Sequence, residues 1–138
     1  MPPVQIRNAN VSTAIAPPQP RWQSFHFNVQ NFKDLPTTKD HYVATPLFSC
    51  NGHKWCLLIY PGGEGDTNDE YMSVVLHHLS EGSISTSYEV MLVDKFGRRK
   101  KARQSSITTR SFKGIGHGFG CTNFIKRFHI LDETHNML

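Results

Sequence analysis

Histidine and cysteine are the residues of this chain whose chemistry could support a metal site or a nucleophile. The sequence holds eight histidines and three cysteines. His53 and Cys56 are close in sequence, but in an extended strand this spacing places them on opposite faces, and the adjacent His77 and His78 diverge in the same way. The sequence has no Cys-x-x-Cys or His-x-x-x-His pair of the kind that commonly forms a zinc site. We therefore expect no metal and no cofactor.

A cysteine beside a histidine could also act as a nucleophilic pair. His117 lies within the glycine-rich segment 114–120, and Cys121 directly follows it. Nothing in the sequence indicates a lowered thiol pKa or a third residue that would orient the histidine, so we predict that the chain is not an enzyme. The segment also departs from the dinucleotide-binding fingerprint, because Phe119 stands where a third glycine is required. We interpret it as a flexible loop beside a strand edge.

Basic residues concentrate in one part of the chain. Between Lys95 and Lys113 there are eight basic residues and no acidic one. The run from Arg98 to Lys101 could bind a polyanion or serve as a nuclear-localisation signal, but a solvated hairpin loop after the turn at Gly97 is the explanation we prefer. Aromatic residues that would stack on single-stranded nucleic acid are not interleaved with it, so nucleic acid is not the partner we expect.

The cellular compartment follows from what the sequence lacks. No apolar run reaches the length of a membrane span, and the N-terminus has no basic region followed by an apolar stretch, as a signal peptide would. Three cysteines are an odd number for a disulfide framework, which favours reduced thiols. These features predict a cytoplasmic or nuclear protein without a membrane partner.

The chain divides into a tail and one domain. Residues 1–20 contain five of the eight prolines and few apolar groups, a composition that opposes both helix formation and strand pairing. We predict a disordered, proline-rich tail over 1–20 and a single domain over 21–138, a length typical of one core.

The domain must be built from strands, because apolar residues recur with period two. Trp55, Leu57 and Ile59 share one face of a strand that ends at Pro61. Asn51-Gly52 before it is a strong hairpin signal. No stretch is long enough for a helix that connects parallel strands, so we predict an antiparallel sandwich. The expected strands cover 22–29, 42–49 (interrupted by Pro46), 53–60, 71–79, 84–93 and 105–112, with a turn at 94–97 and a short helix or strand at 124–131.

Several ordered motifs resemble a MATH (meprin and TRAF homology) domain, above all that of the speckle-type POZ adaptor proteins. They agree in order and spacing from Trp22 onwards, and comprise Lys54-Trp-Cys-Leu57, Pro61-x-Gly63, Tyr71-Met-Ser73, Asp94-Lys-Phe-Gly97, Phe119-Gly120, Phe124-Ile-Lys-Arg127 and Leu131-Asp-Glu133. The resemblance implies an eight-stranded antiparallel β-sandwich of the TRAF-C/MATH type. It also implies binding of short extended peptides in a shallow groove on one sheet.

Carried over position by position, the resemblance implies a peptide-binding groove made by Val75, Tyr88, Arg110, His117, Gly118, Phe119, Gly120 and Cys121. Tyr88 keeps an aromatic wall, and Phe119 stands where the family usually has tryptophan. Val75 and Arg110 replace tyrosines, Cys121 replaces an aromatic residue, and His117 and Gly118 replace a lysine and an aspartate. We therefore expect a different peptide choice or a low affinity.

The resemblance further implies a partner role. In the adaptor proteins a BTB segment recruits a cullin ubiquitin ligase, so the expected function is substrate recognition for such an adaptor, through a domain that this chain does not contain. The family's last strand also lies beyond Leu138, which would leave a sheet edge unpaired. The alternatives are a receptor-adaptor or assembly module without a ligase link, and polyanion binding through the basic stretch 95–113.

Overall fold

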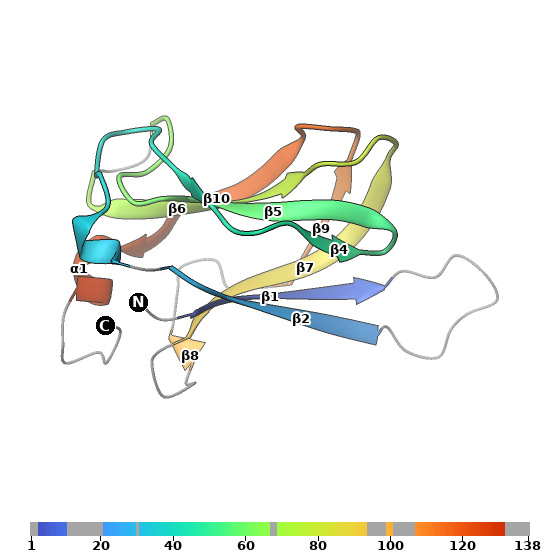
Figure 1. Ribbon diagram of the computed structural model, residues 1–138, viewed down its shortest axis with the longest axis horizontal. Coiled ribbons are helices and arrows are strands. Elements are labelled where there is room, and N and C mark those ends of the chain that lie inside the picture. The colour runs from blue at the N-terminus through green and yellow to red at the C-terminus, as the bar shows by residue number, and fades with distance from the viewer. Residues whose placement is uncertain are drawn as a thin grey trace.

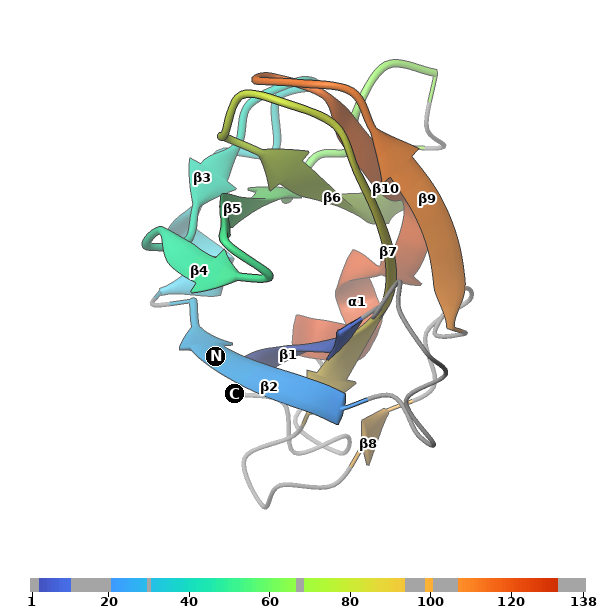
Figure 2. The same ribbon diagram turned by 90° about the vertical axis from the view of Figure 1, so that its right-hand side faces the viewer.

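The protein is a sandwich of two antiparallel β-sheets (Figures 1 and 2). The computed structural model describes residues 3–10, 21–29, 31–66, 69–93, 99–100 and 107–131. Nearly all of its regular structure is strand, with one 3-10 helix, η1 (Phe32–Asp34), and one short α-helix, α1 (Arg127–Leu131). The predicted all-β, antiparallel fold is confirmed. Within the described residues neither helix is long and apolar enough to cross a membrane.

The first sheet, sheet A, has five strands. Strands β1 (Pro3–Asn10) and β7 (Ile84–Val93) lie in its interior, β2 (Arg21–Asn28) lies at one edge, and β8 (Arg99–Lys100) and β9 (Thr108–Phe112) both pair with β7. Every pairing is antiparallel. Within the described residues β9 therefore has one neighbour, and its other edge is open.

The second sheet, sheet B, also has five strands. Its order is β10 (Gly118–Lys126), β6 (Tyr71–His78), β5 (His53–Tyr60) and β3 (Val43–Ala44), and β4 (Phe48–Cys50) pairs with β5 as well. The Asn51-Gly52 hairpin is confirmed, because both residues have positive φ values, 56° and 75°, between β4 and β5. Pro46 separates β3 from β4, which is where the predicted strand over 42–49 is interrupted.

The prediction of a disordered tail over 1–20 is wrong for residues 3–10. These residues form β1, which pairs with β2 on one side and with β7 on the other. The prolines misled the composition argument, because Pro2 and Pro3 precede or begin the strand and the other three lie at 17–20, so 4–10 can donate hydrogen bonds throughout. Residues 11–20, the predicted turn at 94–97 and the chain after Leu131 lie outside the described residues.

The core lies between the sheets and is centred on Trp55, which is fully buried. The Trp55 ring packs edge-on against Phe112 of β9 at 4.8 Å and lies 4.8 Å from the ring of His78. Its indole N–H donates to the Cys50 carbonyl at 3.1 Å. Leu57, Ile59 and further apolar residues of β6, β7 and β10 complete one continuous core, as the period-two pattern predicted.

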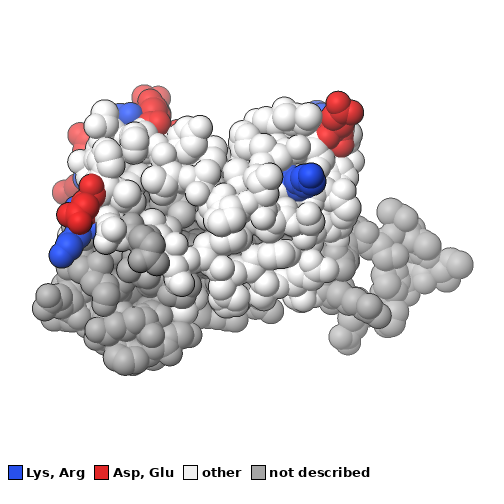
Figure 3. Space-filling model, viewed as in Figure 1, with Lys and Arg blue, Asp and Glu red and all other residues white. Residues whose placement is uncertain are grey.

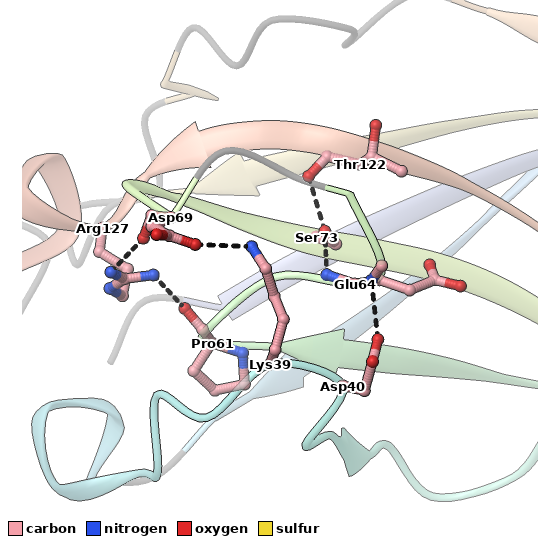
Figure 4. Close-up of polar contacts among 9 residues, drawn as sticks. Lys39, Asp40, Pro61, Glu64, Asp69, Ser73, Thr122 and Arg127 are labelled. Carbon is pink, nitrogen blue, oxygen red and sulfur yellow. Dashed lines mark hydrogen bonds and ion pairs between the residues drawn. The ribbon is translucent and has the colours of Figure 1, made fainter.

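One end of sheet B is braced by polar side chains that bond to backbone (Figure 4). The guanidinium of Arg127 donates to the carbonyls of Pro61 and Asp69. The buried hydroxyl of Ser73 accepts from the Glu64 amide at 3.0 Å and donates to the Thr122 carbonyl at 2.6 Å. These bonds satisfy backbone groups of the loop between β5 and β6 and fix it to β10.

Candidate functional site

Strands β9 of sheet A and β10 of sheet B lie beside each other at one edge of the sandwich (Figure 2). A small cavity lies between them. Its volume is about 70 Å³. It is lined by residues of both sheets, namely Val74, Leu76, Tyr88, Val90, Thr108, Arg110, Phe119, Gly120, Cys121 and Phe124. Five of the eight residues that the resemblance assigns to the groove are brought together here: Tyr88, Arg110, Phe119, Gly120 and Cys121.

Strand β9 directs Arg110 toward the space between the sheets. In the ladder with β7, Arg110 pairs with the buried Thr86, and Phe112, which is fully buried, pairs with Ile84. Residues two apart on a strand share a face. Arg110 therefore lies on the same face of β9 as Phe112, but nearer the start of the strand. Its guanidinium carbon lies 5.4 Å from the centre of the Phe119 ring, a cation–π distance.

Strand β10 supplies the opposite wall. Phe119 pairs with Leu76 and Cys121 with Val74, so both side chains lie on the core face of sheet B. The Phe119 ring meets Phe112 edge-on at 5.0 Å. Beyond Cys121 the register with β6 shifts before Ile125, and such an irregularity bends an edge strand. Within the described residues β10 pairs only with β6, which leaves its outer edge open.

Tyr88 lines the cavity beside Arg110. Burial raises the pKa of its phenol above the ordinary value of 10.0, and the charge and hydrogen bond of Arg110 oppose that rise. The phenol therefore stays neutral at physiological pH. Tyr88 can orient Arg110 but cannot act as a base at neutral pH.

The three remaining predicted residues lie away from the cavity. Val75 pairs with Leu58 on the outer face of sheet B, where Gly118 and Gly120 approach it closely. A Cβ built on Gly120 would lie 2.6 Å from Val75 Cγ2, and one on Gly118 would lie 2.9 Å from Val75 Cγ1. His117 precedes β10, and its ring packs 4.7 Å from that of Phe119. His117 therefore borders the site through Phe119, whereas Val75 and Gly118 face another side of the sheet.

The predicted flexible loop over 114–120 is shorter and better fixed than expected. Gly118 to Gly120 belong to β10. The rest is tied to the buried His78 by three bonds: its Nδ1 donates to the Gly114 carbonyl at 2.9 Å, its amide donates to the His117 carbonyl, and its carbonyl accepts from the Gly116 amide. His78 in turn contacts His53, with Nδ1 of His53 2.7 Å from Nε2 of His78. Since Nδ1 of His78 carries its proton, Nε2 must accept from His53.

The cavity does not resemble a thiol active site. All three cysteines are described and are free thiols. Cys50 and Cys56 are buried, and burial raises the pKa of both thiols. Cys121 lies four residues along an extended strand from His117, roughly 13 Å, and Nδ1 of His117 accepts the Lys113 amide instead. Among the described residues no group of three or more His, Cys, Asp or Glu could hold a metal ion.

Sequence reasoning missed five lining residues. Val90 and Thr108 lie two positions from Tyr88 and Arg110, so the period-two rule could have found them. Val74 and Leu76 are the core-face neighbours of Val75, which lies on the other face of sheet B, because a one-residue difference reverses the face of a strand. Phe124 follows the register shift in β10, which no periodic pattern reveals.

A second hollow lies at the opposite edge, between β2 and β3, with a volume of about 390 Å³. Its lining is mainly apolar, includes Phe27, Val29, Val43 and Ile59, and carries no carboxylate, lysine or arginine. On the face shown in Figure 3, the described charged side chains are few and lie mostly toward the two ends, with one basic side chain within the face. The larger hollow therefore lacks the fixed charge that distinguishes the cavity between β9 and β10.

The comparisons with known proteins agree with this architecture. The sequence profile described as "MATH domain" matches residues 24–138. The chain is 28% identical over 115 residues, 80% of its length, to TD and POZ domain-containing protein 4 of Mus musculus, and 28% identical over 87 residues, 59% of its length, to protein 3 of that name. It spans less than a third of the length of these relatives, 30% and 24% respectively. The profile match and the β-sandwich together show that the chain belongs to the MATH domain family, whose members are protein-interaction modules.

Proposed function

We propose that this chain binds short extended peptides along the open edge of β10, with one peptide side chain inserted between β9 and β10. The observation that carries the proposal is the coincidence of a β10 edge that no described strand pairs with and a cavity walled by Phe119, Tyr88 and Arg110. An added strand would draw affinity from backbone hydrogen bonds and selectivity from the pocket under alternate side chains.

The size of the cavity supports peptide recognition over small-molecule binding. Pockets for small molecules commonly enclose roughly 300–1,000 Å³, whereas this cavity has about 70 Å³ and takes one side-chain end. Phe119 is the anchor, because a rigid aromatic ring buries a large area at small entropic cost. Its ring is only partly buried, so area remains for a ligand to cover.

We also propose a role in substrate selection for a cullin-type ubiquitin ligase in the cytoplasm or nucleus. Its support is the similarity to the mouse TD and POZ domain-containing proteins together with the resemblance to speckle-type adaptors. The recruiting domain would lie outside this chain, and the chain itself would perform no catalysis. A receptor-adaptor role without a ligase is the alternative, and detection of a cullin complex by pull-down with a full-length adaptor would separate the two.

The test of peptide binding is calorimetry or a peptide array with the variants Phe119→Ala and Tyr88→Phe. We expect Phe119→Ala to weaken binding at least tenfold, the loss typical of an aromatic anchor, and Tyr88→Phe to weaken it less. Ile115→Ala is the matched control, because Ile115 is an exposed apolar residue outside the cavity lining. Unchanged affinity in a folded Phe119→Ala protein would exclude this site.

Polyanion binding remains the second candidate because of the eight basic residues between Lys95 and Lys113. Much of that stretch lies outside the described residues. A titration with heparin at rising salt distinguishes it, since a contact through phosphate or sulfate groups weakens steeply with salt, whereas anchoring through Phe119 does not.

A further inference from the structure

Arg110 is the one charged residue in the lining of the cavity between β9 and β10. The other described lining residues are apolar, hydroxylic, thiol-bearing or glycine, and none is a carboxylate. Arg110 is an exposed residue, and the cavity lining gives its charge no counter-ion. The ring of Phe119 and the oxygen of Tyr88 compensate it in part.

The guanidinium of Arg110 can bind a ligand group in addition to contacting Phe119 and Tyr88. It is planar and carries several N–H donors in a fork that matches the two oxygens of a carboxylate or phosphate. The Phe119 ring lies at a cation–π distance from the group and Tyr88 lines the same cavity, so both neighbours restrict the orientations of the fork. Arg110 is itself exposed at the mouth of the cavity, so an incoming group can reach it without opening the core.

The surroundings favour an anion over a neutral hydroxyl. The walls formed by Val74, Leu76 and Phe124 exclude water from one side of the site, and an ion pair strengthens as the local dielectric constant falls. A Ser/Thr-rich peptide, which the family resemblance implies, would leave the charge of Arg110 without a counter-ion. An oxyanion on the ligand would supply one and would also use the fork geometry.

We propose that Arg110 recognises an anionic side chain of the bound peptide, which carries either a carboxylate or a phosphate. In the peptide this side chain lies next to an apolar residue that packs on Phe119. This inference rests on the proposed peptide-binding function and deepens it by naming the class of ligand. Thr108 lines the same cavity and shares a strand face with Arg110.

The experiment is a positional-scanning library of short extended peptides presented to the full chain. Each position is fixed in turn as Glu, Gln, phosphoserine or Ser, so every anion has a neutral partner of similar shape. We expect one position at which Glu or phosphoserine binds at least tenfold more tightly than Gln or Ser. A preference for Glu as well as phosphoserine identifies a site that binds carboxylates. A preference for phosphoserine alone identifies a site that is specific for phosphate.

Three variants assign that preference to Arg110. Arg110→Gln should abolish it while peptides with an apolar anchor still bind, and Arg110→Lys should reduce it, because lysine keeps the charge but lacks the fork. Lys113→Gln is the matched control, since it removes one positive charge from an exposed neighbour outside the cavity lining, and it should leave the preference intact.

The outcomes separate the two proposals. Peptide binding that depends on Phe119 but shows no anionic preference, or a preference that Arg110→Gln retains, overturns this inference and leaves the proposed function standing. Equal losses in Arg110→Gln and Lys113→Gln also overturn it, because they indicate general attraction to a basic surface. Failure of every peptide to bind the folded protein overturns both proposals.

Discussion

Strands β5 and β10 both pair with β6 in sheet B, yet they carry different kinds of side chain. In β5, Trp55, Leu57 and Ile59 are at most 1% exposed and pack into the centre of the core. In β10, Phe119 and Cys121 are only partly buried, and glycines alternate with them. The difference follows from position, because β5 has neighbours on both sides and β10 has an open edge within the described residues.

This contrast separates the part of the sheet that determines stability from the part that can evolve a binding preference. A change in β5 alters packing on all sides of the side chain, where interiors are dense and respond to single methylenes. A change at Phe119 or Cys121 of β10 alters a partly buried surface beside an edge that no described strand covers. The two strands should therefore respond differently to substitution.

The largest effect is expected for Trp55→Ala. It removes a fully buried indole and its hydrogen bond to Cys50, and truncations of this size cost about 3–5 kcal/mol. The free energy of unfolding from urea titration measures it, and Phe119→Ala is the comparison in β10, where we expect less than half that loss. Equal losses in the two variants would contradict the contrast between the strands.

A glycine of β10 should be less tolerant than its place at an edge suggests. A Cβ on Gly120 would lie 2.6 Å from Val75 Cγ2 and 2.8 Å from the Val74 carbonyl oxygen, so Gly120→Ala should cost about 1–3 kcal/mol through overpacking. Thermal unfolding measures the loss. In the double variant with Val75→Ala the side-chain clash is gone but the backbone clash remains, so partial recovery is expected, and none would point to another cause.

Acid should weaken the contact of His53 in β5 with His78, the residue that holds the segment before β10. Burial, together with the charge of His78, lowers the pKa of His53 below its ordinary value of 6.5. The unfolded chain therefore takes up a proton at higher pH than the folded one, and stability declines as pH falls below about 6.5 toward the lowered pKa.

Urea titrations between pH 7.5 and 5 measure this decline. His53→Gln is the informative variant, because its amide can still donate to His78 but does not titrate. We expect a shallower dependence on pH in that variant than in the unaltered chain. An identical pH profile would place the titration elsewhere in the protein.

The smallest effect on stability is expected for Arg110→Gln. Arg110 is exposed at the mouth of the cavity and contacts Phe119 and Tyr88 at its margin, so the unfolding free energy should change by no more than about 0.5 kcal/mol. The same variant should lose the preference for anionic peptides. A stability loss as large as that of Gly120→Ala would mean that Arg110 serves the core rather than the ligand.

The sequence predicted interior strands well and edge features poorly. β5 and β7 are covered on the core face, so burial imposes a period of two that can be counted, and the hairpin at Asn51-Gly52 follows from local backbone preference. The start of β10 carries glycines with no apolar period, and Gly118 and Gly120 are explained by their approach to Val75, a contact between strands. Of the candidate site, Tyr88, Arg110, Phe119, Gly120 and Cys121 are gathered at one cavity, whereas Val75 and Gly118 face away because a single residue reverses a strand face.

Strand β1 has a consequence for the order of events during folding. Val4 pairs with Phe27 on one side and with Leu92 on the other, so a strand near the start of the chain lies inside sheet A between a near neighbour and a distant one. The β1–β2 pairing can form early, whereas the pairing with β7 must close most of the chain into a loop. Contacts of such long sequence separation slow the search for the native state, and we expect docking of β7 against β1 to set the refolding rate.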